Sequence, residues 1–166
     1  VSGSNHAISF STDGSDRSME TTFSRQQYTK FSMDIFPGSM NHEVKFIDSN
    51  NGNVVFNIFF ATDRGDADGI YFSSSDDANG SIINLGSTGS RSNGTELDAP
   101  ANRRYYNIEF VNIDYANQTL DINVDGITEA TNEPFILNGT PDIFACSGNS
   151  GGAKTEGFVD NVFAEL

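Results

Sequence analysis

Short segments of alternating apolar and polar residues run along the chain, separated by clusters of Gly, Asn, Ser and Asp. The clearest alternation places Phe31, Met33 and Ile35 on one face of an extended segment, which ends at Pro37-Gly38. A period of two is typical of an antiparallel strand with one buried face, and clusters of turn residues are typical of the loops between such strands. The pattern therefore predicts a chain of β-strands.

The segment VVFNIFFAT, residues 54–62, is apolar on both faces, which predicts a strand in the middle of its sheet. The strand before it, around Val44 and Phe46, is joined to it by the turn NNGN at residues 50–53, a hairpin signal. Further strands are predicted at residues 7–10, 69–73, 82–85, 105–113, 119–124, 134–137, 142–146 and 156–165.

The fold class follows from the number of these strands and from the lack of helical patterns. No stretch carries apolar residues at a spacing of 3.6 over three turns. Many short strands without helices predict an all-β fold, a two-sheet antiparallel β-sandwich of the jelly-roll kind. A length of 166 residues without a repeat or a linker predicts one domain over residues 1–166.

The balance of charge excludes several kinds of partner. Nine Lys and Arg against 23 Asp and Glu give a net charge of −14, which argues against binding nucleic acid or an anionic membrane surface. No apolar run approaches the roughly 18 residues of a membrane span. Because the sequence opens at Val1 without Met, we expect a mature product or an excised module of a secreted, extracellular bacterial protein.

Two segments resemble a known family of sandwiches. YYNIEFVNIDYANQTLDINVDG, residues 105–126, resembles the penultimate hairpin of concanavalin A-like and laminin-G-like domains, in which the return strand closes on a Val-Asp-Gly turn. EGFVDNVFAEL, residues 156–166, is similar to the last strand of these domains and of jelly-roll carbohydrate-binding modules. The resemblance implies glycan binding most often, protein or lipid-linked ligands in some members, and glycoside hydrolase or polysaccharide lyase activity in a minority.

The sequence lacks the motifs of the enzymes in this fold. No strand carries the Glu-x-Asp-x-x-Glu spacing that places two carboxylates on one face, and no Gly-x-Ser-x-Gly elbow occurs. His6 and His42 do not lie in a Gln-Ile/Val-His strand of the lyase type. We therefore expect a non-catalytic protein, and a small polysaccharide lyase or glycoside hydrolase remains an alternative.

One tract combines cations with aromatic rings in this acidic chain. RRYY, residues 103–106, suits a carboxylate or sulfate group on an acidic, for example algal, polysaccharide. In the alternative, the arginines pair with Asp98 and Glu109 while one tyrosine packs in the core. The expected ligand-binding residues are Tyr71, Arg103, Arg104, Tyr105 and Tyr106.

Asp160 is a carboxylate inside an otherwise apolar closing strand, and if it is buried it must be paired or bound to a metal. The resemblance to jelly-roll modules implies that this residue ligates a structural Ca²⁺ together with oxygens near the amino terminus. Asp13 and Asp16 are the nearest candidates. In the alternative, Asp160 faces solvent or accepts hydrogen bonds from backbone amides.

These observations together predict a non-catalytic carbohydrate-binding module. We expect it to bind a polysaccharide or oligosaccharide as a monomer within a larger, secreted polysaccharide-degrading enzyme. An adhesion or structural domain of a bacterial surface protein is the alternative from another class, and an exposed apolar patch in place of an aromatic and polar surface would favour it.

Overall fold

Within the part of the chain that the structure describes, twelve strands form two antiparallel sheets of six strands each. The computed structural model describes residues 8–11, 17–36, 41–61, 69–73, 82–85, 104–135, 139–149 and 156–166. The first sheet has the order β1 (Ile8–Ser11), β12 (Glu156–Glu165), β3 (Lys30–Phe36), β8 (Tyr106–Asp114), β9 (Thr119–Val124) and β10 (Ile127–Pro134). The second has the order β2 (Arg17–Thr22), β11 (Ile143–Asn149), β4 (Asn41–Asp48), β5 (Asn53–Ala61), β6 (Gly69–Ser73) and β7 (Ile82–Leu85).

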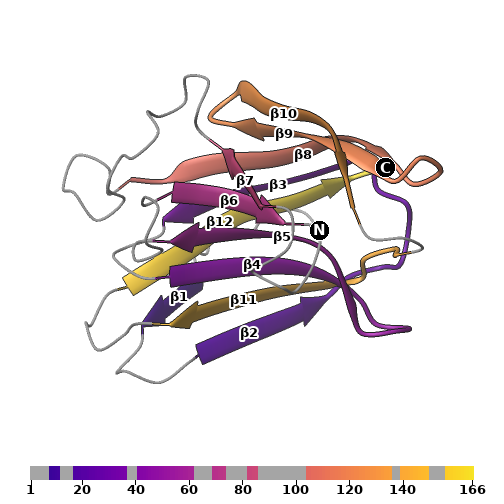
Figure 1. Ribbon diagram of the computed structural model, residues 1–166. Coiled ribbons are helices and arrows are strands. Elements are labelled where there is room, and N and C mark those ends of the chain that lie inside the picture. The colour runs from indigo at the N-terminus through magenta and orange to yellow at the C-terminus, as the bar shows by residue number, and fades with distance from the viewer. Residues whose placement is uncertain are drawn as a thin grey trace.

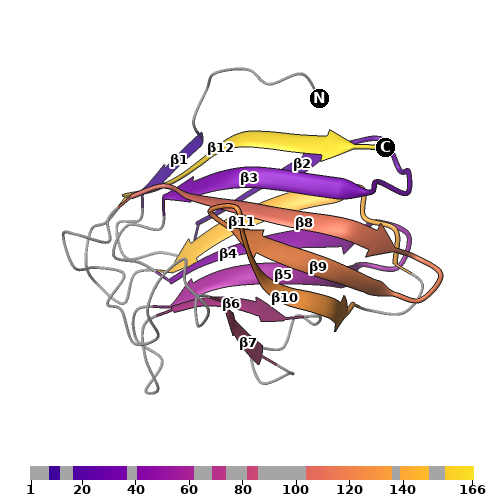
Figure 2. The same cartoon turned by 90° about the horizontal axis from the view of Figure 1, so that it is seen from above.

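The two sheets lie face to face, with their strands running in similar directions (Figures 1 and 2). Alternate residues of β3, such as Phe31, Met33 and Ile35, are buried between the sheets while their neighbours are only partly buried. This is the alternation that the sequence predicts for a strand with one face in the core. The all-β fold and the two-sheet jelly-roll sandwich are confirmed.

Phenylalanine rings from both sheets fill the centre of the core. Phe46 and Phe56 of the second sheet lie with their ring centroids 4.8 Å apart, and Phe56 lies 4.8 Å from Phe110 of the first sheet. None of these three side chains is more than 1% exposed. Each buried Phe contributes about 1.5–3 kcal/mol, and aromatic pairs add about 0.5–1.5 kcal/mol, so this cluster holds the two sheets together.

The two predicted hairpins are present. The turn at residues 49–52 joins β4 to β5, and Gly52 there has φ +73°, a conformation that glycine adopts readily. Strand β5 lies between β4 and β6, and residues 54–59 are all buried, as predicted for a central strand. Strand β9 follows β8 and ends at Asp125-Gly126, where both φ angles are positive, as in a tight type I′ hairpin turn.

Two strands differ from the sequence-based expectation. Strand β2 was not among the strands predicted from residue pattern, and β10 occupies residues 127–134, whereas a strand was predicted at 134–137, of which residues 136 and 137 lie outside the described residues. Both strands lie at the edge of a sheet. An edge strand buries less of its surface and is often polar, so ITEATNEP and RSMETT lack the apolar alternation that marks central strands.

The described ranges contain no helix long and apolar enough to cross a membrane.

Candidate functional site

The outer face of the second sheet carries two rows of side chains that run across β4, β5 and β6. Val44, Phe46, Phe56, Ile58, Ile70 and Phe72 lie in the core, so the residues between them point to the outer face. The strand register pairs Lys45 with Asn57 and Asn57 with Ser73. Two residues further along each strand, on the same face, the register pairs Glu43 with Phe59 and Phe59 with Tyr71. We call these six residues the polar-aromatic face: Glu43, Lys45, Asn57, Phe59, Tyr71 and Ser73.

Hydrogen bonds fix the carboxylate of Glu43 within this face. Asn57 donates from Nδ2 to Glu43 Oε1 at 3.0 Å, and Lys45 Nζ lies 3.2 Å from Glu43 Oε2. The side chains of Glu43 and Lys45 remain 29% and 24% exposed. The group therefore offers a partly accessible acceptor and a partly accessible donor, and the charges of the two side chains compensate each other.

The aromatic half of the face consists of Phe59 and Tyr71. Their rings are stacked, with centroids 5.3 Å apart and planes inclined by 17°. They are 6% and 8% exposed and form a hydrophobic cluster separate from the main core. The stacked pair is therefore largely buried, and the accessible part of the face is the polar pair of Glu43 and Lys45.

Two polar side chains of the face are fully buried although they point away from the core. Asn57 is 1% exposed and Ser73 is 0% exposed. Asn and Ser are usually exposed when they face solvent, and burying them without hydrogen bonds costs free energy. Their burial, in one row with Lys45 and beside the aromatic pair, therefore distinguishes this sheet face from an ordinary solvated one.

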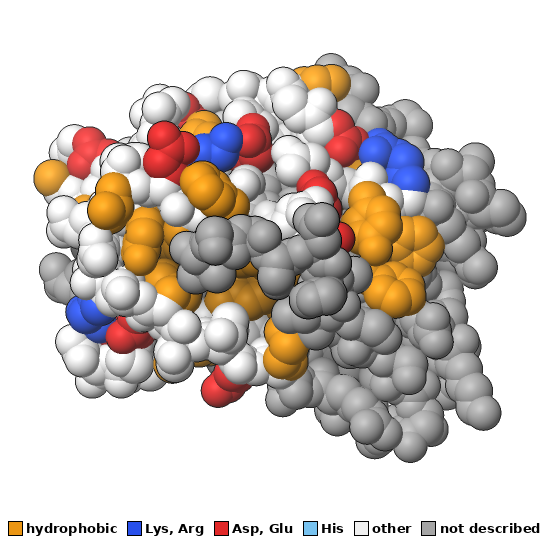
Figure 3. All heavy atoms as spheres, turned by 180° about the vertical axis from the view of Figure 1, so that it is seen from behind, with side chains coloured by type: hydrophobic (Ala, Val, Ile, Leu, Met, Phe, Trp, Pro, Cys, Tyr) orange, Lys and Arg blue, Asp and Glu red, His pale blue; other side chains and the backbone are white. Residues whose placement is uncertain are grey.

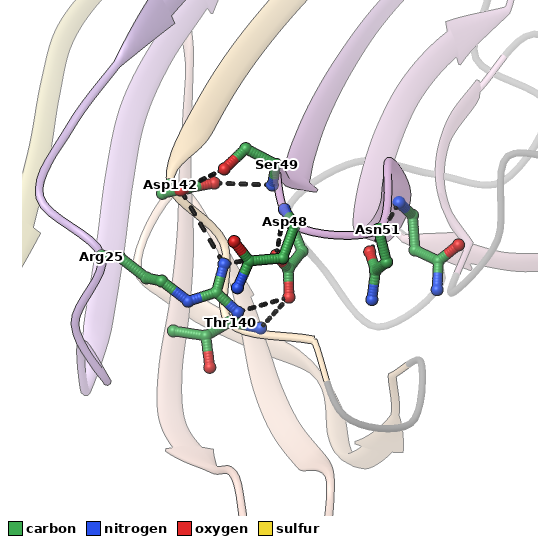
Figure 4. A network of polar contacts seen from close by, with 8 residues as sticks. Arg25, Asp48, Ser49, Asn51, Thr140 and Asp142 are labelled. Carbon is green, nitrogen blue, oxygen red and sulfur yellow. Dashed lines mark hydrogen bonds and ion pairs between the residues drawn. The ribbon is translucent and has the colours of Figure 1, made fainter.

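An ion-pair network fixes the turn between β4 and β5, the two strands that carry Glu43 to Phe59 (Figure 4). The Arg25 guanidinium donates to both carboxylate oxygens of Asp48, and the amide of Thr140 donates to Asp48 Oδ2 at 3.1 Å. Asp142 accepts hydrogen bonds from the amide of Ser49 at 2.8 Å and from its hydroxyl at 2.6 Å.

Asp48 is only 1% exposed, and the hydrogen bond from Arg25 lowers its pKa to about 2. The carboxyl group is therefore ionised at neutral pH. The network holds together the end of β4, the segment after β2 and the segment before β11, and thus the base of the polar-aromatic face.

Of the residues expected to bind ligand, only Tyr71 lies on this face. Arg104, Tyr105 and Tyr106 lie at the start of β8 in the first sheet, and Arg103 lies outside the described residues. Tyr106 is 1% exposed and packs in the core. The structure therefore separates Tyr71 from the RRYY tract.

The Arg104 guanidinium is engaged within the protein. Its Nη2 donates to Asp125 Oδ2 at 2.7 Å, its Cζ lies 4.1 Å from the centroid of the Tyr106 ring, and the hydrogen bond to Asp125 raises the pKa of Arg104. This arrangement fits the alternative interpretation of the RRYY tract, in which an arginine is paired within the protein and one tyrosine packs in the core. The partner of Arg104 is Asp125, which that interpretation did not name. Glu109 instead pairs with Lys30.

Asp160 lies on β12 and accepts a hydrogen bond from the amide of Asn161 at 2.8 Å, as in the alternative given for it above. Asp13 and Asp16 lie outside the described residues. Within the described ranges, no group of three or more His, Cys, Asp and Glu side chains is placed to hold a metal ion. The Ca²⁺ site at these three residues stays a prediction.

The sequence reasoning missed Glu43, Lys45, Asn57, Phe59 and Ser73. One signal was present, because Asn57 is the single polar residue inside the apolar run VVFNIFF. The pairing of Phe59 with Tyr71 depends on the register between β5 and β6, which the sequence does not reveal.

No model of a known protein family matches this sequence, and no curated protein matches it. Solved structures do resemble its fold. A tetrameric galectin from the ball sponge Cinachyrella sp. is similar over 90% of this chain and 100% of its own, with 9% identity and a TM-score of 0.63. A β-glucanase from Bacillus licheniformis is similar over 96% of this chain and 78% of its own, with 12% identity and a TM-score of 0.54.

A sialidase is similar over 96% of this chain, with 12% identity and a TM-score of 0.69, and the chain spans 15% of the length of that protein. At these identities the likeness concerns the fold alone. The fold is a concanavalin A-like jelly-roll sandwich, as the resemblance of residues 105–126 and 156–166 implies.

Proposed function

We propose that this protein binds a polysaccharide or oligosaccharide on the polar-aromatic face without cleaving it. The observation that carries the proposal is the pairing of the stacked rings of Phe59 and Tyr71 with the hydrogen-bonded group of Glu43, Lys45 and Asn57. The polar group provides oriented and partly exposed acceptors and donors for sugar hydroxyls, and the stacked rings, which are 6% and 8% exposed, support it as a rigid apolar edge. The fold that the chain shares with a galectin and a β-glucanase supports a glycan ligand.

The arrangement of carboxylates supports binding without hydrolysis. Of the six residues of the polar-aromatic face, only Glu43 carries a carboxylate, whereas a glycosidase uses two carboxyl groups about 5–10 Å apart. Both oxygens of Glu43 are engaged, one by the amide of Asn57 and the other by the ammonium of Lys45. Glu43 therefore acts in the proposal as a fixed hydrogen-bond acceptor.

The match to a small part of a sialidase supports a place within a larger protein. We propose that the domain is a module of a secreted bacterial enzyme that degrades polysaccharides, and that it directs this enzyme to its substrate. The adhesion domain remains the competing proposal, and the binding experiment decides between them.

The experiment is affinity gel electrophoresis against neutral and acidic plant and algal polysaccharides, followed by a glycan array. We expect retention by one class of polysaccharide without release of reducing ends. Glu43→Gln should weaken binding about tenfold, because a hydrogen bond to a charged acceptor is worth about 1.5–3 kcal/mol. Retention by none of the polysaccharides would overturn the proposal and favour adhesion.

Glu109→Gln is the matched control. Glu109 lies on the first sheet and, like Glu43, contacts one lysine and one asparagine, Lys30 and Asn123. We expect the polysaccharide gels to retain this variant as they retain the unchanged protein, so equal losses in both variants would refute a site on the second sheet. The same gels run with Ca²⁺ and with EDTA test the predicted ion, whose removal should reduce retention.

A further inference from the structure

A second surface with aromatic and polar rows lies on the outer face of the first sheet. The register pairs Phe158 of β12 with Phe36 of β3. Two residues further along β12, Asp160 is paired with Asp34 of β3. Asp34 is paired in turn with Asn107 of β8. An aromatic row and an acidic row therefore lie side by side.

Tyr105 extends the aromatic row at the start of β8. The rings of Tyr105 and Phe36 are 5.6 Å apart and inclined by 61°, and those of Phe36 and Phe158 are 5.7 Å apart and inclined by 69°. Tyr105 is 44% exposed and Phe36 and Phe158 are partly buried, so the Tyr105 end of this row is open to contact with a ligand. Figure 3 views the molecule from the side of the first sheet and shows hydrophobic side chains gathered beside basic and acidic ones.

The two aspartates of the acidic row have neutral hydrogen-bond donors as partners. Asp34 accepts from Asn107 Nδ2 at 2.8 Å and from Asn161 Nδ2 at 2.7 Å, and Asp160 accepts from the backbone amide of Asn161. Like charges directly opposite each other on neighbouring strands repel, and amide donors reduce this repulsion without removing the charge. The row therefore presents two negative charges.

The described cations next to this row are already paired with other carboxylates. Arg104 binds Asp125, and Lys30 binds Glu109. Burial and, after it, the charges of Asp160 and Asp34 raise the pKa of Tyr105, the exposed end of the aromatic row. A ligand that suits this surface is therefore positively charged, in contrast to the acidic polysaccharide expected for the RRYY tract.

We propose that the aromatic row of Tyr105, Phe36 and Phe158, together with Asp34 and Asp160, binds the protonated amino group of an amino-sugar oligosaccharide. An ammonium group is attracted to aromatic rings and donates hydrogen bonds to carboxylates, and a sugar ring packs its CH face on an aromatic side chain. A row of three aromatic side chains is much smaller than the roughly 800 Å² per partner of a stable protein interface, which favours a small glycan over a protein. The ligand class rests on the proposed function, whereas the surface is a different one.

The test is a calorimetric titration with a fully de-N-acetylated glucosamine tetramer and with its fully N-acetylated counterpart. We expect the amino form to bind at least about tenfold more tightly, because acetylation removes the charge that both aspartates and the rings attract. Tyr105→Ala and Asp160→Asn should each weaken binding of the amino form about three- to fivefold. Thermal melts followed by circular dichroism verify that each variant folds.

Asp121→Asn is the matched control for charge. Asp121 lies on β9 of the same sheet and accepts from two asparagines, Asn112 and Asn132, so the substitution removes one charge at a distance from the aromatic row. We expect it to change binding by less than about twofold. Equal weakening by Asp121→Asn and Asp160→Asn would mean attraction to the net charge only and would overturn the proposal, as would equal affinity for the two tetramers.

Two further arms separate the possible outcomes. A lysine tetrapeptide that binds as tightly as the amino-sugar tetramer, and is weakened by the same variants, would assign the surface to a protein partner and overturn the glycan ligand. Glu43→Gln should leave the amino-sugar titration unchanged while it reduces retention in the polysaccharide gels. Failure of the polar-aromatic face is thereby distinguished from failure of this second surface.

Discussion

Replacing Asp48 by Asn removes the negative charge at the centre of the network that fixes the β4–β5 turn. Asp48 accepts hydrogen bonds from the Arg25 guanidinium and from the amides of Asn50 and Thr140. An asparagine has the same shape but offers one acceptor oxygen, and its amide group would face donors. The variant should therefore fold and be less stable.

The magnitude follows from the pKa of Asp48. A carboxyl group whose pKa falls from 3.8 to about 2 on folding contributes at most about 2.5 kcal/mol to the free energy of unfolding at neutral pH. The Arg25 side chain is 34% exposed, and screening by solvent reduces this contribution. We expect Asp48→Asn to cost about 1–2 kcal/mol, which corresponds to a melting temperature lower by about 2–8 °C.

The dependence on pH has a definite sign. The pKa of Asp48 is lower in the folded than in the unfolded state, so its contribution to stability is complete above the unfolded value of 3.8 and is lost as the pH falls from there toward 2. The unchanged protein should therefore lose its advantage over Asp48→Asn across this interval. Between pH 5 and pH 7 the difference should stay constant.

The assay is urea unfolding followed by circular dichroism and by the fluorescence of the five tyrosines, since the chain has no tryptophan. Curves are measured at pH 7, 5, 3.5 and 2.5. Glu20→Gln, at an exposed position of β2, removes the same charge outside the network and should change stability by less than about 0.5 kcal/mol. Equal stability of Asp48→Asn and the unchanged protein at pH 7, or a difference at pH 2.5 as large as the difference at pH 7, would refute the reasoning.

Two further predictions concern the backbone and the single thiol. Asn132 has φ +55° on the edge strand β10, so Asn132→Gly should leave stability unchanged or raise it, while Asn132→Ala should lower it by about 1 kcal/mol; urea unfolding of both variants checks this. Cys146 is 1% exposed and burial raises the pKa of its thiol, so the native protein should react with a thiol reagent far more slowly than the protein in urea, and equal rates would contradict this burial.

Much of the fold could be predicted from the sequence because the central strands are patterned by the core. Strands β3, β5 and β8 each bury at least one full face, and their alternation or continuous apolar character records this. Edge strands such as β2 and β10 bury less, and their sequences reflect solvent more than the core. An edge strand forms because its backbone hydrogen-bonds to a neighbouring strand. Backbone hydrogen bonding depends little on residue type, so the sequence hardly indicates such a strand.

The candidate site was harder to predict, because residues on a sheet face become neighbours through register and not through proximity in sequence. Asp98 and Glu109 were the acidic residues near the RRYY tract in sequence, yet Arg104 pairs with Asp125, 21 residues away. Glu43 and Asn57 are 14 residues apart and meet because the β4–β5 hairpin aligns them diagonally. The types of residue were visible in the sequence, and their combination was not.

The two outer faces of the sandwich differ in how their charges are compensated. On the second sheet, Glu43 is balanced by Lys45 beside buried Asn57 and Ser73, so this face is close to neutral in a chain whose net charge is −14. On the first sheet, the hydrogen bonds to Asp34 and Asp160 within the described ranges come from amide groups. A neutral sugar pays no electrostatic penalty at the first of these surfaces, whereas the second gains most from a cation. Glycans with and without a free amino group should therefore separate the two surfaces within one protein.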